Sequence, residues 1–173
     1  MNKERTITLF LVILTAALSR LLPHPENVAP IAAIALFAGA KFERKSLAFA
    51  LPLLPMLLSD MVLGHPSKLA YLSFALIVCI GFALRKGAGA GRVFAASLSA
   101  SVLFFLVTNC VYLSSGHMYP HTWQGLMLSY EMGIPFFRNT LLGDLFYSAL
   151  LFGGFALAER RFSWLQVRPL ATA

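Results

Sequence analysis

Residues 93–115 read VFAASLSASVLFFLVTNCVYLSS, a run of 23 residues without a charged side chain. A helix of about 20 mostly apolar residues can cross the roughly 30 Å hydrocarbon core of a bilayer, so this run predicts a transmembrane helix. Five other stretches of the chain are also mainly apolar. The six predicted spans are residues 6–22, 28–42, 46–63, 69–84, 93–115 and 138–158.

Composition points to the same class of protein. Of the 173 residues, 58% are hydrophobic and 12% are charged, and the mean hydropathy is +0.75. Because soluble domains carry about 25% charged residues, an ordinary soluble enzyme is excluded. We expect an all-α membrane protein, a six-transmembrane-helix bundle that forms one domain over residues 1–173. Between the last two spans, residues 122–132 predict a short amphipathic helix on the membrane surface.

The positions of Lys and Arg predict the orientation of the bundle. Short loops rich in Lys and Arg stay in the cytoplasm. With six spans and the N-terminus inside, eleven of the fourteen basic residues fall on the cytoplasmic side, and only Arg20, Lys68 and Arg138 fall outside. We therefore expect both termini in the cytoplasm. The net charge of +7 is explained by topology, and we expect no nucleic-acid partner.

Polar residues that could bind a ligand collect on the predicted outer side. Ionisable groups inside the apolar slab normally face a partner or a watery cavity. The outer residues are His24, His65, His117, His121, Glu26, Asn27, Asp60, Asn109, Tyr112, Glu131, Arg138, Asn139 and Asp144. Two interpretations stay open. The charged residues could fasten the helices as an ion-pair network, or they could line a cup that opens to the outside.

The two cysteines also allow two interpretations. Cys79 lies in the fourth predicted span and Cys110 in the fifth, and neither belongs to a zinc-type pair. A free cysteine usually acts as a small buried hydrophobe. Alternatively, a thiolate could bind the metal of a metal-bearing substrate.

The sequence lacks the motifs of several enzyme classes. It has no phosphate-binding GxxxxGK[ST] loop, no HExxH zinc motif and no GxSxG elbow. We therefore expect a transporter rather than an enzyme, and one that does not itself hydrolyse ATP. An enzyme of the outer leaflet, with Asp60 and either His24 or His117 as acid and base, remains an alternative. A membrane assembly subunit without a small ligand is a third hypothesis.

Several motifs resemble a family of small bacterial membrane proteins. They are RLLPHPxN from Arg20 to Asn27, the Ala- and Gly-rich run ending in Lys41-Phe42, LSD ending at Asp60, and IPFFRNTLLGD from Ile134 to Asp144. This family is similar to the substrate-binding S-components of energy-coupling-factor vitamin transporters. Within that group, the closest resemblance is to the solitary cobalamin-specific BtuM proteins. The resemblance covers nearly the whole chain.

The resemblance implies a six-helix transporter of the bacterial inner membrane that takes a vitamin, cobalamin or a related corrinoid, from a periplasmic pocket. Cobalamin would be the cargo, with no intrinsic cofactor. The partners would be the bilayer and, for energy, separate ATPase and transmembrane coupling subunits. In such proteins a cysteine thiolate ligates cobalt and can displace cyanide, which makes Cys79 the first candidate and Cys110 the second. The expected ligand-binding residues are His24, Asp60, Tyr112, Arg138, Asn139 and Asp144.

Overall fold

The computed structural model describes residues 3–18, 28–63, 67–113 and 118–166, and within these ranges the chain forms helices and no β-strand. The helical segments are α1 (Lys3–Leu18), α2 (Ile31–Lys41), α3 (Lys45–Leu63), α4 (Lys68–Ala83), η2 (Leu84–Lys86), α5 (Ala90–Thr108), α6 (Trp123–Ser148), η3 (Ala149–Gly153), α7 (Gly154–Arg161) and η4 (Ser163–Leu165). The segments η2 and η4 are 3₁₀ turns, and η3 is a π-helical turn. The predicted all-α class is confirmed for the described residues.

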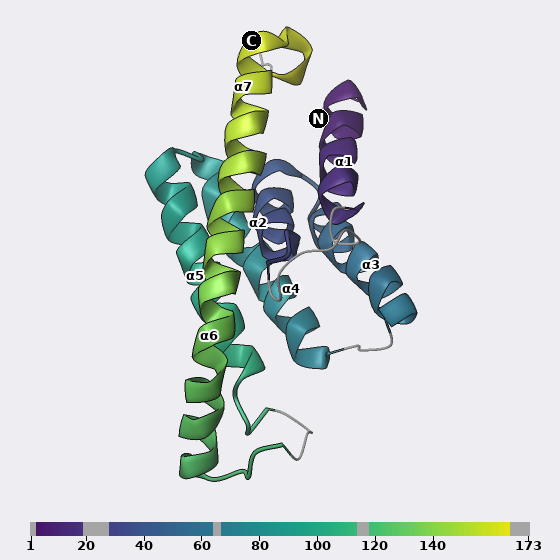
Figure 1. Ribbon diagram of the computed structural model, residues 1–173. Helices are drawn as coiled ribbons and strands as arrows, with labels where there is room; N and C mark the ends of the chain where they lie inside the picture. Colours follow the sequence, from purple (N-terminus) through teal and green to yellow (C-terminus); the bar gives the residue numbers. More distant parts are fainter. Residues whose placement is uncertain (1–2, 19–27, 64–66, 114–117, 167–173) are drawn as a thin grey trace.

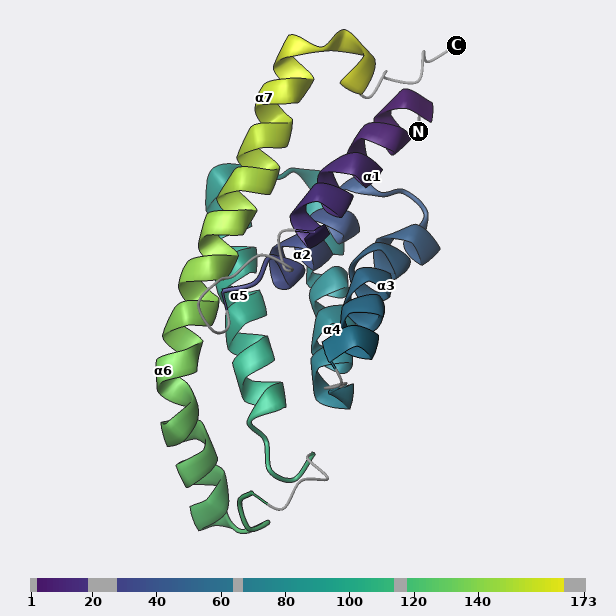
Figure 2. The same cartoon turned by 45° about the vertical axis from the view of Figure 1, so that its right-hand side comes forward.

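The short helix α2 lies at the centre of the bundle, with the other helices packed around it (Figures 1 and 2). Every residue from Ile31 to Gly39 is buried. A helix that is apolar on all sides is typical of a protein core, because no face of it tolerates water. The burial of α2 therefore fixes the positions of the helices that surround it.

Two glycines allow α2 and α4 to pack at very short range. A Cβ atom on Gly39 would collide with the carbonyl oxygen of Val78, and one on Gly81 would lie 2.5 Å from the carbonyl oxygen of Leu36. Small residues at such contacts let two helix backbones approach closely. This crossing holds α4 against the centre of the bundle.

The structure differs from the prediction in the last third of the chain. The expected surface helix at 122–132 and the expected span at 138–158 are parts of one continuous helix, which runs through α6, η3 and α7 from Trp123 to Arg161. In Figure 1 it forms the long vertical rod from green to yellow. Pro135 lies inside α6 and does not end it, although an interior proline removes a backbone hydrogen bond and crowds the preceding turn.

The fifth predicted span is too long at its C-terminal end. The helix α5 ends at Thr108, and Asn109 is its C-cap, with a backbone N–H that donates to the carbonyl oxygen of Phe105 at 3.2 Å. The residues that follow, including Cys110 and Tyr112, lie beyond the helix. The prediction that Cys110 lies within a helix is therefore wrong.

Among the residues that the structure describes, three helical stretches are long and apolar enough to cross a membrane. They are Lys68–Lys86, Ala90–Thr108 and Trp123–Arg161, while Ile31–Lys41 and Lys45–Leu58 are apolar but shorter. The chain thus has the helices of a membrane protein.

An ion-pair cluster, here called the clasp, ties the first helix to the last. Glu159 of α7 accepts from Arg5 of α1 at 2.8 Å and from Lys41 of α2 at 3.3 Å. Arg5 also donates to the carbonyl oxygen of Leu165. Arg5 and Lys41 lie over the ring of Phe155, 5.2 Å and 4.9 Å from its centroid. The clasp closes the end of the bundle at which α1 begins and α7 ends (Figure 1).

Candidate functional site

A cavity of about 420 Å³ lies between the start of α4, the end of α5 and the middle of α6. Its walls combine four aromatic rings with hydroxyl and amide groups, from Phe104, Phe105, Phe136, Phe137, Thr108, Asn109 and Thr140. The rings of Phe105 and Phe137 pack together with centroids 4.9 Å apart. Such a mixture of apolar walls and a few polar groups is typical of a small-molecule site.

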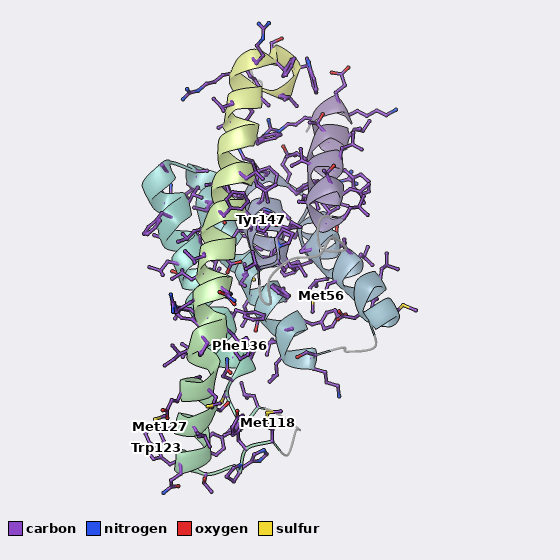
Figure 3. All side chains as sticks on the ribbon, viewed as in Figure 1. Met56, Met118, Trp123, Met127, Phe136 and Tyr147 are labelled. Atoms are coloured by element: carbon purple, nitrogen blue, oxygen red, sulfur yellow. The ribbon has the colours of Figure 1, made fainter. Side chains whose placement is uncertain are left out.

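Two further cavities adjoin this one along the same pair of helices. The first, of about 330 Å³, shares Thr108 and Asn109 with it and is also lined by Cys110, Tyr119 and Ser129. The second, of about 60 Å³, shares Phe104 and Thr140 and is bounded by Asp144. We call the three cavities together the α5–α6 groove. Figure 3 shows Phe136 partway along α6, with Met118 and Trp123 at the far end.

The end of α5 is held against α6 by side chains that bond to its free carbonyl groups. The hydroxyl of Tyr130 donates to the carbonyl oxygen of Leu106 at 2.9 Å, and that of Ser129 donates to the carbonyl oxygen of Asn109 at 2.9 Å. A Cβ atom on Gly133 would lie 2.7 Å from Oδ1 of Asn109. The missing side chain at Gly133 therefore leaves room for the Asn109 amide within the groove.

Asp144 forms the deep end of the α5–α6 groove. The residue is only 2% exposed, and the hydroxyl of Ser101 donates to its Oδ2 at 2.7 Å. One helical turn further along the same contact, the hydroxyl of Ser148 on α6 donates to that of Ser97 on α5 at 3.2 Å. A buried acid needs hydrogen-bond partners, and this row of serines crosses the α5–α6 contact where apolar side chains would otherwise pack. The deep end of the groove is therefore polar, in a region where the neighbouring helices are mainly apolar.

Asp60 lies elsewhere in the bundle. It is buried, and the hydroxyl of Tyr71 on α4 donates to its Oδ2 at 2.8 Å. It does not line the α5–α6 groove. The structure therefore does not bring Asp60 and Asp144 together, and Asp60 joins α3 to α4.

The other predicted binding residues are dispersed. Arg138 is exposed on α6 and Asn139 is half-buried beside it, and neither lines the α5–α6 groove. Tyr112 is exposed after α5, with its ring centroid 6.4 Å from that of His121. His24 lies outside the described residues. Of the six predicted binding residues, the structure places Asp144 in the groove.

The two cysteines differ in their surroundings. Cys79 is exposed on α4 and lies outside the α5–α6 groove. Cys110 is half-buried and lines the 330 Å³ cavity beside Asn109. Within the described ranges, no three His, Cys, Asp or Glu side chains converge on a point where they could hold a metal ion. Of the two cysteines, Cys110 is the one that lines the groove.

Several residues that form the groove are not among those predicted from the sequence. They are Ser101, Phe104, Phe105, Thr108, Ser129, Gly133 and Thr140. A signal for one of them was present, because Ser97 and Ser101 are four residues apart in an apolar run. That spacing puts both hydroxyls on one face of a helix.

The sequence profile of a family of unknown function, DUF6580, matches residues 1–168 of the chain. No curated protein and no solved structure matches it.

Proposed function

We propose that this chain, which belongs to the DUF6580 family, is a membrane-embedded binding protein that takes up a small organic molecule of the vitamin class. The observation that carries the proposal is the α5–α6 groove, with aromatic walls, a central amide and a buried acid at its deep end. A cobalamin or a related corrinoid is the first ligand to test. The alternative of an outer-leaflet enzyme gains no support from Asp60, which is bonded to Tyr71.

The distribution of charge supports a periplasmic opening for the groove. Arg5, Lys41 and Arg160 lie at the clasp end of the bundle, where α1 begins and α7 ends. The groove runs along α5 and α6 away from that end (Figure 3). Because basic residues stay on the cytoplasmic side, we place both termini inside, the groove outside and six spans in the inner membrane.

The size of the groove supports a ligand larger than an ion. Small-molecule sites usually have volumes of about 300–1,000 Å³. The cavities of about 420 Å³ and 330 Å³ fall in this range, and together they give an elongated space. A flat, amide-bearing molecule could place its apolar faces on Phe105 and Phe137 and its amides near Asn109 and Thr140. A complete corrinoid is larger than both cavities together, so it would fill them and extend beyond the groove.

Cys110 becomes the first candidate for a cobalt ligand, in place of Cys79. Its position in the groove supports this choice, since Cys79 lies on an exposed face of α4. A thiolate is the form of cysteine that binds metals. Energy for release to the cytoplasm would come from separate ATPase and coupling subunits, because the chain has no phosphate-binding loop.

The ligand is tested by purifying the protein from cells grown with cyanocobalamin and recording its visible spectrum. We expect a bound corrinoid whose spectrum differs from that of the free vitamin. Cys110→Ser should abolish the difference, and Cys79→Ser, the matched control, should keep it. A protein without colour in every case would overturn the corrinoid assignment.

Uptake itself is tested by blocking the groove. Thr140→Trp would fill the cavity that Thr140 lines, whereas Leu142→Trp adds the same ring to an exposed position on α6. In a strain that lacks its own vitamin uptake systems, we expect Thr140→Trp to abolish growth on limiting vitamin. Leu142→Trp should support growth as the unmodified protein does. Equal growth with both variants would contradict the proposed role of the groove.

A further inference from the structure

A second pair of cavities lies at the clasp end of the molecule, separate from the α5–α6 groove. One is an apolar groove of about 500 Å³ between α1 and the α6–α7 rod, here called the α1–α7 groove. Its lining residues include Leu11, Leu150, Gly154, Phe155 and Ala158. The other, the basic pocket, has about 590 Å³ and is lined by Arg5, Lys41, Arg85, Glu43 and Glu159.

The basic pocket carries an excess of positive charge. Three cationic and two acidic side chains line it. Glu159 is shared between two cations, Arg5 and Lys41, so one carboxylate faces two positive charges. Arg85 uses its Nε to donate to the carbonyl oxygen of Gly39 at 2.9 Å, which fixes the guanidinium at the pocket wall. The side chains that line the pocket thus carry one more positive than negative charge.

The two cavities lie next to each other at the clasp, although no residue lines both. Phe155 lines the α1–α7 groove, and the same ring lies beneath the cations of Arg5 and Lys41, at 5.2 Å and 4.9 Å. Ala158 lines the groove and its neighbour Glu159 lines the pocket. An apolar channel along the helices thus ends at a cluster of cations.

We propose that the α1–α7 groove and the basic pocket together form a binding site for one anionic phospholipid. An acyl chain lies in the groove against Leu11 and Leu150, and the phosphate of the headgroup lies in the pocket near Lys41. An apolar groove that lies next to a pocket of net positive charge matches the chemistry of such a lipid, which has apolar acyl chains and an anionic headgroup. Basic pockets between transmembrane helices on the cytoplasmic side bind anionic headgroups for this reason. An apolar partner helix would fill the groove but would leave the excess positive charge of the pocket unbalanced.

The test uses the full-length protein in neutral detergent, stripped of lipid and titrated with phosphatidylglycerol or phosphatidylcholine of identical acyl chains. Native mass spectrometry counts the lipids bound. We expect one phosphatidylglycerol to bind at least about fivefold more tightly than phosphatidylcholine, the effect of one basic side chain near an anionic surface. Equal binding of the two lipids would overturn the proposal.

Two variants of the clasp separate lipid binding from a purely structural role. Lys41→Gln removes a cation and Glu159→Gln removes an anion, and each breaks the same ion pair. We expect Lys41→Gln to weaken phosphatidylglycerol binding about fivefold and Glu159→Gln to strengthen it. Lys45→Gln, at an exposed position outside the pocket, is the control for charge and should leave binding unchanged. A loss of binding in both clasp variants would mean that the pair only holds the helices together.

Two adjacent glycines test the acyl-chain groove. A Cβ atom meets no other atom within 4 Å at either Gly153 or Gly154, but only Gly154 lines the α1–α7 groove. Gly154→Leu should therefore abolish selective binding of phosphatidylglycerol, while Gly153→Leu keeps it. If Gly154→Leu instead leaves lipid binding intact and converts a dimer to a monomer, the groove is an interface between two copies and the lipid proposal fails.

Discussion

The hydrogen bond between Ser101 and Asp144 is the residue-scale contact on which the deep end of the α5–α6 groove depends. The Asp144 carboxyl is almost fully buried, and Ser101 donates to it at 2.7 Å. A buried polar group that loses its hydrogen-bond partner lowers the stability of the folded state, because the group lost its contacts with water on folding and nothing replaces them. The buried Asp144 carboxyl therefore depends on Ser101 as a hydrogen-bond donor.

Ser101→Ala should destabilise the protein by removing this donor. We expect the free energy of unfolding to fall by about 1–3 kcal/mol, the cost of an unsatisfied buried polar group. Ser99→Ala is the matched control, since Ser99 is exposed on the same helix and bonds only to the carbonyl oxygen of Ala95 among the contacts of the described residues. Thermal unfolding in detergent measures both variants. Equal shifts would show that Ser101 contributes no more than a surface serine.

At the scale of elements, the contact between α2 and α4 depends on two glycines without side chains. Gly39→Ala would place a methyl group against the backbone carbonyl of Val78, and a backbone atom cannot move aside as a side chain can. We expect a loss of about 1–3 kcal/mol in the free energy of unfolding, which is typical of overpacking. Denaturant unfolding in mixed micelles provides the measurement.

Gly153→Ala is the control for that variant. Gly153 also lies within a helical segment, but its Cβ would meet open space. Alanine favours a helix over glycine by up to about 1 kcal/mol, so this change should leave stability unchanged or raise it. If both variants behaved alike, the close approach of α2 and α4 would not limit stability.

The sequence predicted the types and positions of several elements well, because long apolar runs between basic loops have few alternatives to a helix. The predicted spans 46–63 and 69–84 agree with α3 and α4 to within one residue at each end. The prediction failed between Trp123 and Arg138, where polar residues indicated a separate surface helix. Hydrogen bonds between helices explain why this segment continues α6 instead of forming a separate helix. Ser129 and Tyr130 donate to backbone carbonyl groups at the end of α5 and hold the segment in line with the rest of α6.

The candidate site was harder to predict than the helices. Periodicity showed that Asp144 lies within an apolar run, but which helix faces it depends on long-range packing. Ser101 is 43 positions away in the chain, and no local pattern pairs the two. Arg138 and Asp60 were selected for their charge, yet Arg138 is on an exposed face of α6 and Asp60 is on α3, which does not line the groove.

For the whole molecule, the orientation in the membrane can be measured with single cysteines. In a background of Cys79→Ser and Cys110→Ser, we introduce Gln124→Cys near the start of α6 or Lys45→Cys at the start of α3, both exposed positions. A membrane-impermeant maleimide added to intact spheroplasts should label Gln124→Cys. Lys45→Cys should react only after the membrane is opened.

The reverse pattern of labelling would place the α5–α6 groove in the cytoplasm and would end the uptake proposal. The test does not depend on any ligand. It therefore separates an error in orientation from an error in the choice of vitamin.

The length of the α6–η3–α7 rod has a mechanical consequence for the bilayer. Its 39 residues measure about 58 Å at 1.5 Å per residue, almost twice the roughly 30 Å of hydrocarbon. Even at a steep inclination of about 40°, the rod still spans about 44 Å along the membrane normal. A rod of this length that crosses a bilayer therefore has at least two helical turns in the headgroup layer or the water. Figure 2 shows the first turns of α6 extending past α2, α3 and α4, so under the proposed orientation the protruding turns would be those beside the entrance of the groove.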